Sequence, residues 1–96
     1  MGQDRLGQLK PSQLRVLIAV ADGGSFSEAA LQLQLSQSAV SYAIATLEED
    51  LGVVLFSRGR YGAVSTPVGQ PIVERARHVL PLIADIYQQA NPAQGF

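Results

Sequence analysis

The chain has 96 residues, a formal net charge of -1 and no cysteine. This length suits one domain with a modest core, and the missing cysteines exclude thiol catalysis and cysteine-ligated zinc. No apolar run approaches the ~20 residues that cross a bilayer, and the N-terminus is too polar for a secretory signal, so we expect a soluble cytoplasmic protein without a membrane partner.

Charged residues are unevenly distributed along the chain. Residues 1–20 carry a net charge of +2, residues 21–54 carry -5, and residues 55–80 carry +3. A local basic surface can therefore coexist with an acidic total. The alternative is that these charges are simply scattered over a solvated surface.

The first predicted helix begins at Pro11, after a polar arm without periodicity. Proline suits the first helical position because its missing N–H would have no partner there. Apolar residues then recur at helical spacing at positions 14, 17, 18 and 21. Gly23 and Gly24 end this helix.

Residues 27–52 have the pattern of two helices joined by a tight turn. Ser25 or Ser27 can cap the first helix, in which small alanines permit a close crossing. Ser36 is placed to cap the second helix, and Gly52 can end it in a left-handed conformation. The spacing puts one apolar set on a buried face of the second helix: Val40, Ile44, Leu47 and Leu51. The opposite stripe is small or uncharged, apart from one ring: Gln37, Ser38, Ser41, Tyr42 and Ala45. This is the construction of a helix-turn-helix.

A short hairpin is predicted after Gly52. Residues 53–56 are apolar and strand-like, residues 57–62 have turn chemistry, and residues 63–65 can return as a second strand. Arg58, Arg60 and Tyr61 are expected near its tip.

A long last helix is predicted from Thr66 and Pro67, a cap followed by proline at the first helical position. It carries an apolar seam with heptad-like spacing: Ile72, Ala76, Val79, Ile83, Ile86 and Ala90. The seam predicts a dimer contact, although it could instead pack on its own domain. Pro81 is interior and is expected to bend the helix. Asn91 and Pro92 end it.

These elements predict a mainly α fold, a winged helix-turn-helix with three helices and a two-stranded wing. We expect this winged domain to occupy residues 1–66, a linker and dimerisation helix to occupy 67–91, and a tail to occupy 92–96.

Residues 9–90 resemble the N-terminal DNA-binding domain of LysR-type bacterial transcriptional regulators. The segments that carry the resemblance are, in chain order, Ser25-Phe26, Ala29-Ala30, 36–41, 47–52, 55–58 and 66–69. Their order and spacing are more specific than any one of them alone.

The resemblance implies sequence-specific binding of double-stranded DNA by a homodimer at an interrupted inverted repeat, with transcription regulation as the purpose. The implied DNA-binding residues are Ser36, Gln37, Ser38, Ser41, Tyr42, Arg58, Arg60 and Tyr61. Tyr42 and Tyr61 stand where basic residues are frequent in the family. The family's effector-binding domain has no counterpart in these residues, so we expect an excised domain and a small-molecule effector only through that missing part.

Each of these roles has an alternative. The polar residues of the second helix of the pair could be merely solvated, and Arg58 and Arg60 could be solubilising turn charges. Tyr42 could bind DNA or lie on its own helix. The whole domain could be a winged-helix protein-interaction module with weak or no DNA binding, and its negative net charge is consistent with this alternative. We expect no enzyme, no cofactor and no metal, because His78 is the only histidine and has no nucleophile or second ligand at usable spacing.

Overall fold

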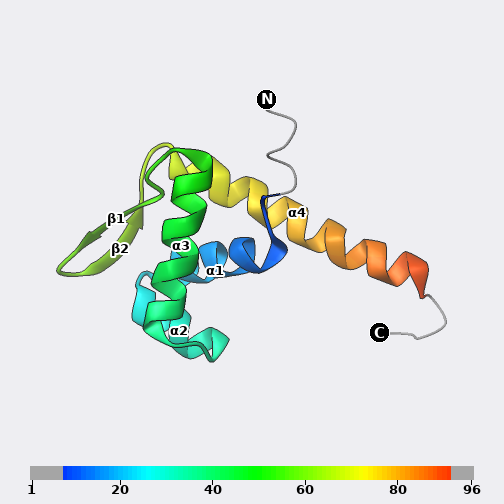
Figure 1. Cartoon of the computed structure of the whole chain (residues 1–96), viewed down its shortest axis with the longest axis horizontal. Coiled ribbons are helices and arrows are strands. Elements are labelled where there is room, and N and C mark those ends of the chain that lie inside the picture. The colour runs from blue at the N-terminus through cyan, green and yellow to red at the C-terminus, as the bar shows by residue number, and fades with distance from the viewer. Residues whose placement is uncertain (1–7, 92–96) are drawn as a thin grey trace.

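The structure is a computed structural model that describes residues 8–91. Three helices are followed by an antiparallel hairpin and a long fourth helix (Figure 1). In chain order the elements are α1 (Pro11–Gly23), α2 (Phe26–Leu33), α3 (Gln37–Leu51), β1 (Phe56–Gly59), β2 (Gly62–Ser65) and α4 (Gly69–Ala90). The fold is a winged helix-turn-helix with an appended helix, which confirms the predicted fold class. The predicted polar arm before residue 8 and the tail at residues 92–96 lie outside the described residues.

Local chemistry sets the helix boundaries as predicted. The hydroxyls of Ser25 and Ser36 each accept the backbone N–H three residues ahead at 3.0 Å, which caps α2 and α3. Gly24 and Gly52 follow α1 and α3 with φ of 75° and 74°, in the left-handed region that favours glycine. The starts of α2 and α3 and the ends of α1 and α3 are therefore set by residues that the sequence analysis had identified.

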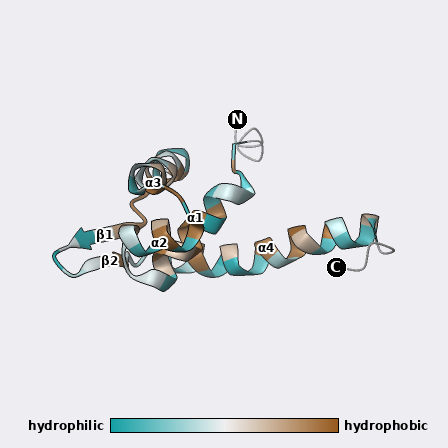
Figure 2. Ribbon diagram, turned by 90° about the horizontal axis from the view of Figure 1, so that it is seen from below, coloured by the Kyte–Doolittle hydropathy of each residue, from teal (hydrophilic) through white to brown (hydrophobic). Residues whose placement is uncertain are grey.

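The core is built around α1, which contacts α2, α3 and α4. Figure 2 shows the apolar sides of these helices turned toward one another. Ala29 of α2 is fully buried, so its small side chain lets α2 and α3 cross closely. Five further side chains are the largest that are fully buried: Leu17, Leu47, Leu55, Val20 and Val40. The apolar face predicted for α3 is the face that is buried.

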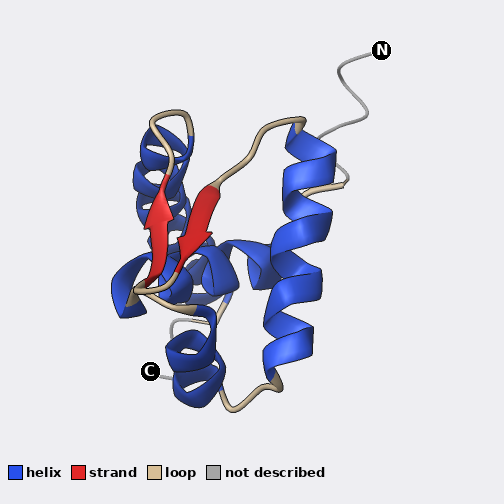
Figure 3. Ribbon diagram, turned by 90° about the vertical axis from the view of Figure 1, so that its left-hand side faces the viewer, coloured by secondary structure: helices blue, strands red, loops and turns tan. Residues whose placement is uncertain are grey.

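The wing differs in register from its prediction. The first strand was expected at residues 53–56 and a long turn at 57–62, but β1 begins at Phe56 and only residues 60 and 61 separate it from β2. Leu55 explains the shift, because its side chain is fully buried and its backbone N–H and carbonyl make hydrogen bonds outside the hairpin. Its N–H donates to Glu48 Oε2 at 2.7 Å, and its carbonyl accepts from the Thr66 N–H at 2.9 Å. Leu55 and Phe56 of the apolar run thus belong to the core, whereas Val54 is 62 % exposed, and the hairpin extends beyond the core (Figure 3).

The last helix begins at Gly69, two residues later than predicted, so Pro67 is not its first residue. Thr66 still contributes at this end, because its Oγ1 accepts the Gly69 N–H at 3.0 Å. It continues through Pro81 to Ala90 as one helix. The bend expected at Pro81 stays a prediction. The C-terminal half of α4 extends beyond the three-helix body (Figure 1).

The predicted seam of α4 is divided between two environments, which corrects its assignment as a continuous dimer surface. Ala76 is 2 % exposed and Ile72 packs against the core, so both contact the chain's own domain. Ile83 is half-buried, whereas Val79, Ile86 and Ala90 are exposed. Periodicity marks an apolar face but does not say which body covers each part of it.

None of the helices between residues 8 and 91 has the length and apolar character that spanning a bilayer requires.

Candidate nucleic-acid interface

The exposed stripe of α3 lies where the sequence predicted it. Gln37 and Ser38 are exposed in the first turn, Ser41 is half-buried, and Tyr42 is 75 % exposed. The opposite face carries the fully buried Val40. This stripe has no charged side chain in its first two turns, so a surface approaching it meets hydroxyls, an amide and one ring.

Ser36 has a structural role in addition to its predicted one. Its Oγ accepts the Ala39 N–H and lies 3.3 Å from the Ser38 Oγ. A hydroxyl has one proton to donate besides its acceptor lone pairs. Ser36 can therefore keep its cap and still donate to an anion at the start of α3, where the helix dipole favours negative charge.

The wing brings its polar residues to the start of α3. Gln37, Arg58, Arg60 and Tyr61 all line one hollow of about 420 Å³, whose other walls come from the start of α2 and from β2. Tyr61, in the turn of the hairpin, is 92 % exposed. Of the eight predicted residues, these four surround the same space, whereas Ser36, Ser38, Ser41 and Tyr42 are not among its walls.

The hairpin is docked on the loop between α1 and α2. The Ala63 N–H donates to the Gly24 carbonyl at 2.8 Å. A Cβ at Gly62, whose φ is 119°, would lie 2.2 Å from that same oxygen. Gly62 is thus needed for the close approach, and the wing has a fixed position beside α3.

The charges of the interface are fewer than the basic segment 55–80 indicated. Only Arg58 and Arg60 are on the wing, and the other two arginines of that segment are on α4. Arg77 makes a bidentate contact with Asp22, at 2.6 and 3.3 Å. This hydrogen bonding lowers the pKa of Asp22 and raises the pKa of Arg77, so both stay charged and neutralise each other. Among the described residues, the hollow between the wing and α3 therefore has two arginines in its walls, Arg58 and Arg60.

Several residues that shape the site were not identified from the sequence. The ring of Phe26 lies under the Arg58 guanidinium, whose central carbon is 3.8 Å from the ring centroid. The carboxylate of Glu48 on α3 accepts the Leu55 N–H at the base of the wing. No periodic pattern connects Phe26 with Arg58 or Glu48 with Leu55, because each pair joins different elements. Phe26 was identified only as part of one of the segments that carry the family resemblance.

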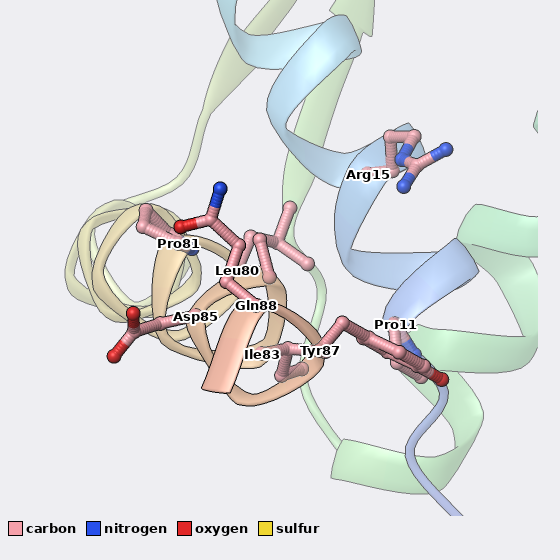
Figure 4. A pocket seen from close by; sticks show the side chains of 9 residues that line it. Pro11, Arg15, Leu80, Pro81, Ile83, Asp85, Tyr87 and Gln88 are labelled. Atoms are coloured by element: carbon pink, nitrogen blue, oxygen red, sulfur yellow. The ribbon is translucent and has the colours of Figure 1, made fainter. Parts of the chain in front are cut away.

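A second surface lies between α1 and the protruding half of α4. Figure 4 shows its walls, with Tyr87 of α4 pointing toward Pro11 at the start of α1. The hollow has a volume of about 650 Å³. Beside it, α4 exposes large apolar side chains that include two absent from the predicted seam, Leu82 at 62 % and Tyr87 at 68 %.

The geometry of the described residues bears on one kind of centre only, a cluster of metal-ligating side chains. No group of three or more potential metal ligands occurs between residues 8 and 91. His78 Nδ1 lies 2.8 Å from the Glu74 carbonyl oxygen one helical turn earlier, and because a carbonyl only accepts, Nδ1 donates there.

Comparison with known proteins identifies relatives over most of the chain. Residues 11–70 match the family described as "Bacterial regulatory helix-turn-helix protein, lysR family". The chain is 54 % identical over 84 residues to the probable HTH-type transcriptional regulator LrrA of Synechococcus elongatus, covering 88 % of this chain and 29 % of the relative. It is 40 % identical over 75 residues to the transcriptional activator AllS of Klebsiella pneumoniae, covering 78 % and 28 %. The chain thus spans less than a third of the length of these curated relatives.

Two solved structures have the same fold at nearly full coverage. The crystal structure of the CbnR_DBD-DNA complex matches with a TM-score of 0.84 and 35 % identity, over 90 % of this chain and 99 % of that one. The crystal structure of the BenM_DBD/benA site 1 DNA complex matches with a TM-score of 0.83 and 29 % identity, over 91 % and 98 %.

Proposed function

This chain belongs to the LysR family of bacterial regulatory helix-turn-helix proteins, and we propose that it binds double-stranded DNA sequence-specifically, as a homodimer on an interrupted inverted repeat. It would act in the cytoplasm as the DNA-binding part of a transcription regulator. We assign any small-molecule effector to the part of its relatives that this chain does not span.

One observation carries the proposal: the start of α3 and a docked wing form one continuous polar surface. Gln37 at the first position of α3 and Arg58, Arg60 and Tyr61 of the wing share one hollow. A protruding helix N-terminus beside a basic hairpin can contact base edges and phosphates together. Two structural relatives with the same arrangement of elements are described as DNA complexes, which supports this use of the surface.

We propose that the residues of this surface divide into two roles. Gln37, Ser38, Ser41 and Tyr42 project from the exposed stripe of α3 and would read base edges in the major groove. The second set would bind the phosphate backbone: Ser36, Arg58, Arg60 and Tyr61. Phosphate contacts fix the register of the protein on DNA, and base contacts give the sequence preference.

We propose that the protruding half of α4 forms the dimer contact. Its exposed apolar side chains are Val79, Leu82, Ile86 and Tyr87, and Ile83 and Ala90 lie on the same half. Large exposed apolar side chains that gather on one helix mark an interaction surface. A two-fold dimer would present two α3 helices to two half-sites, and therefore to an inverted repeat.

Selection from a pool of randomised duplexes tests the proposal. We expect enrichment of a two-fold symmetric motif whose half-sites lie about one helical turn, or a multiple of it, apart. A pool that stays random after repeated rounds, together with binding that is equally weak on all duplexes, would favour the protein-interaction alternative that the acidic total supports.

A charge on the seam tests the dimer. Ile86→Asp places a carboxylate among apolar side chains at a position that is 66 % exposed in one domain, so folding should be preserved while pairing is lost. Gln88→Asp is the matched control, since two residues correspond to about 200° around the helix. Sedimentation should show a monomer for the first variant and a dimer for the second. A dimeric Ile86→Asp protein would contradict this assignment of the interface.

A further inference from the structure

The side chain of Arg58, one of the two arginines of the wing, packs on an aromatic ring. Its guanidinium lies over the ring of Phe26, with the central carbon 3.8 Å from the ring centroid. Phe26 is 5 % exposed, and its ring meets that of Phe56 edge to face, at a centroid distance of 6.2 Å and an angle of 81°. The ring under Arg58 is therefore held by the core, so it is a rigid platform.

We propose that Phe26 is a positioning residue for DNA binding, which holds Arg58 in the orientation that contacts a phosphate. The inference rests on the proposed function. It assigns a role in DNA recognition to a buried aromatic residue that does not itself touch DNA.

The geometry leaves the binding edge of the guanidinium open. Stacking occupies one face of the planar group, whereas its N–H donors point outward in the plane. Within residues 8–91, Arg58 makes no hydrogen bond or ion pair that would occupy those donors. A stacked arginine keeps its charge and its donors but gives up much of the rotamer freedom that phosphate binding would otherwise cost it.

The backbone that carries Arg58 is fixed as well. Arg58 pairs with Ala63 across the hairpin, and the Ala63 N–H donates to the Gly24 carbonyl at 2.8 Å. The turn end of the wing and the guanidinium of Arg58 are thus both tied to the segment that begins α2. Both contacts fix Arg58 beside the start of α2, in the hollow that Gln37 of α3 also lines.

Arg60 provides an internal comparison. It lies on the wing two residues further, lines the same hollow and is exposed, but it has no aromatic ring beneath it among the described residues. A change in Phe26 should therefore affect DNA binding through Arg58 and leave the contribution of Arg60 intact.

A double-mutant cycle on duplex DNA of mixed sequence tests the proposal. Phosphate contacts are independent of sequence, so no operator is needed as probe. Phe26→Leu keeps an apolar side chain and removes the ring, and we expect an affinity loss of about two- to tenfold, because Arg58 regains rotamer freedom that phosphate binding must then restrict. The same substitution should have no effect in an Arg58→Gln background and its full effect in an Arg60→Gln background. An equal loss in both backgrounds would show a merely structural role and overturn the proposal.

Further variants separate positioning from stability. Phe56→Leu alters the neighbouring ring, which is equally buried and makes no cation–π contact with Arg58 among the described residues, so any effect that it has through Arg58 should be smaller than that of Phe26→Leu. Arg58→Lys keeps the charge without the planar group, so it should weaken binding and make binding insensitive to Phe26→Leu. If Phe26→Leu proves unfolded in a thermal melt, Arg58→Lys decides alone, and unchanged affinity overturns the proposal. Wild-type protein that fails to bind the duplex would refute the proposed function itself, whereas wild-type binding without coupling refutes only the role of Phe26.

Discussion

Raising the salt concentration should weaken DNA binding by an amount that the structure sets. Each domain offers the two cations of the wing to DNA, Arg58 and Arg60, because the other cations of the described residues lie at or on α1 and on α4, and the exposed stripe of α3 has no charge in its first two turns. A dimer therefore makes about four ionic phosphate contacts, each contributing about 0.9 to the slope of log affinity against log salt. The expected slope is about -3.6. Between about 50 and 200 mM salt the affinity should fall roughly 150-fold, far less than the ~10³ to 10⁵ of proteins with six to ten contacts.

Fluorescence anisotropy of a labelled duplex at a series of salt concentrations measures this slope. Arg58→Gln or Arg60→Gln removes one contact from each subunit, so each should reduce the slope by about 1.8. Arg15→Gln is the control, because Arg15 lies on α1 beside α4 and should leave the slope unchanged. A wild-type slope steeper than about -6 would show that other cations bind DNA, and a slope near zero would refute phosphate binding by the wing.

Three further substitutions test separate parts of the structure. Gln37→Ala should weaken binding to a selected site by about 1–3 kcal/mol and leave binding to a scrambled duplex unchanged, and equal losses on both would contradict base reading. Gly62→Ala should destabilise the fold by about 1–3 kcal/mol in thermal melts, since its Cβ would meet a carbonyl oxygen at 2.2 Å, whereas Gly59→Ala, with open space around it, should not. Asp22→Asn should abolish the stability that the pair with Arg77 provides. That stability is at most about 1 kcal/mol, because the pair is exposed. Since folding lowers the pKa of Asp22, the contribution is present above the carboxyl's ordinary pKa of about 4 and is lost as the pH falls through the lowered value. Identical profiles of unfolding free energy against pH for the two proteins would contradict this role.

Features determined by neighbouring residues could be predicted from the sequence. The caps at Ser25 and Ser36 and the glycines at 24 and 52 act within one helical turn, so their chemistry identifies helix ends without knowledge of the fold. The buried face of α3 follows in the same way, because helical periodicity decides which side chains share a side.

Features that depend on distant parts of the chain could not be predicted from these patterns. The apolar run before β1 has the composition of a strand. However, the Leu55 side chain lies in the core, and its backbone bonds to Glu48 and Thr66, so the hairpin begins later in the chain than predicted. Ala76 and Ala90 have equivalent places in the seam, yet the first is buried and the second is exposed, because α1 packs against only part of α4. The stacking of Arg58 on a ring of α2 likewise joins residues that no spacing rule connects.

Binding of the wild-type chain to three forms of a selected duplex tests the central claim most directly. The first form carries both half-sites, the second has one scrambled, and the third has both scrambled. Because a dimer makes the second contact effectively intramolecular, the account predicts that scrambling one half-site lowers affinity by about a hundredfold or more, and that scrambling the second lowers it again. Equal affinity for all three duplexes would contradict sequence-specific DNA binding by a dimer.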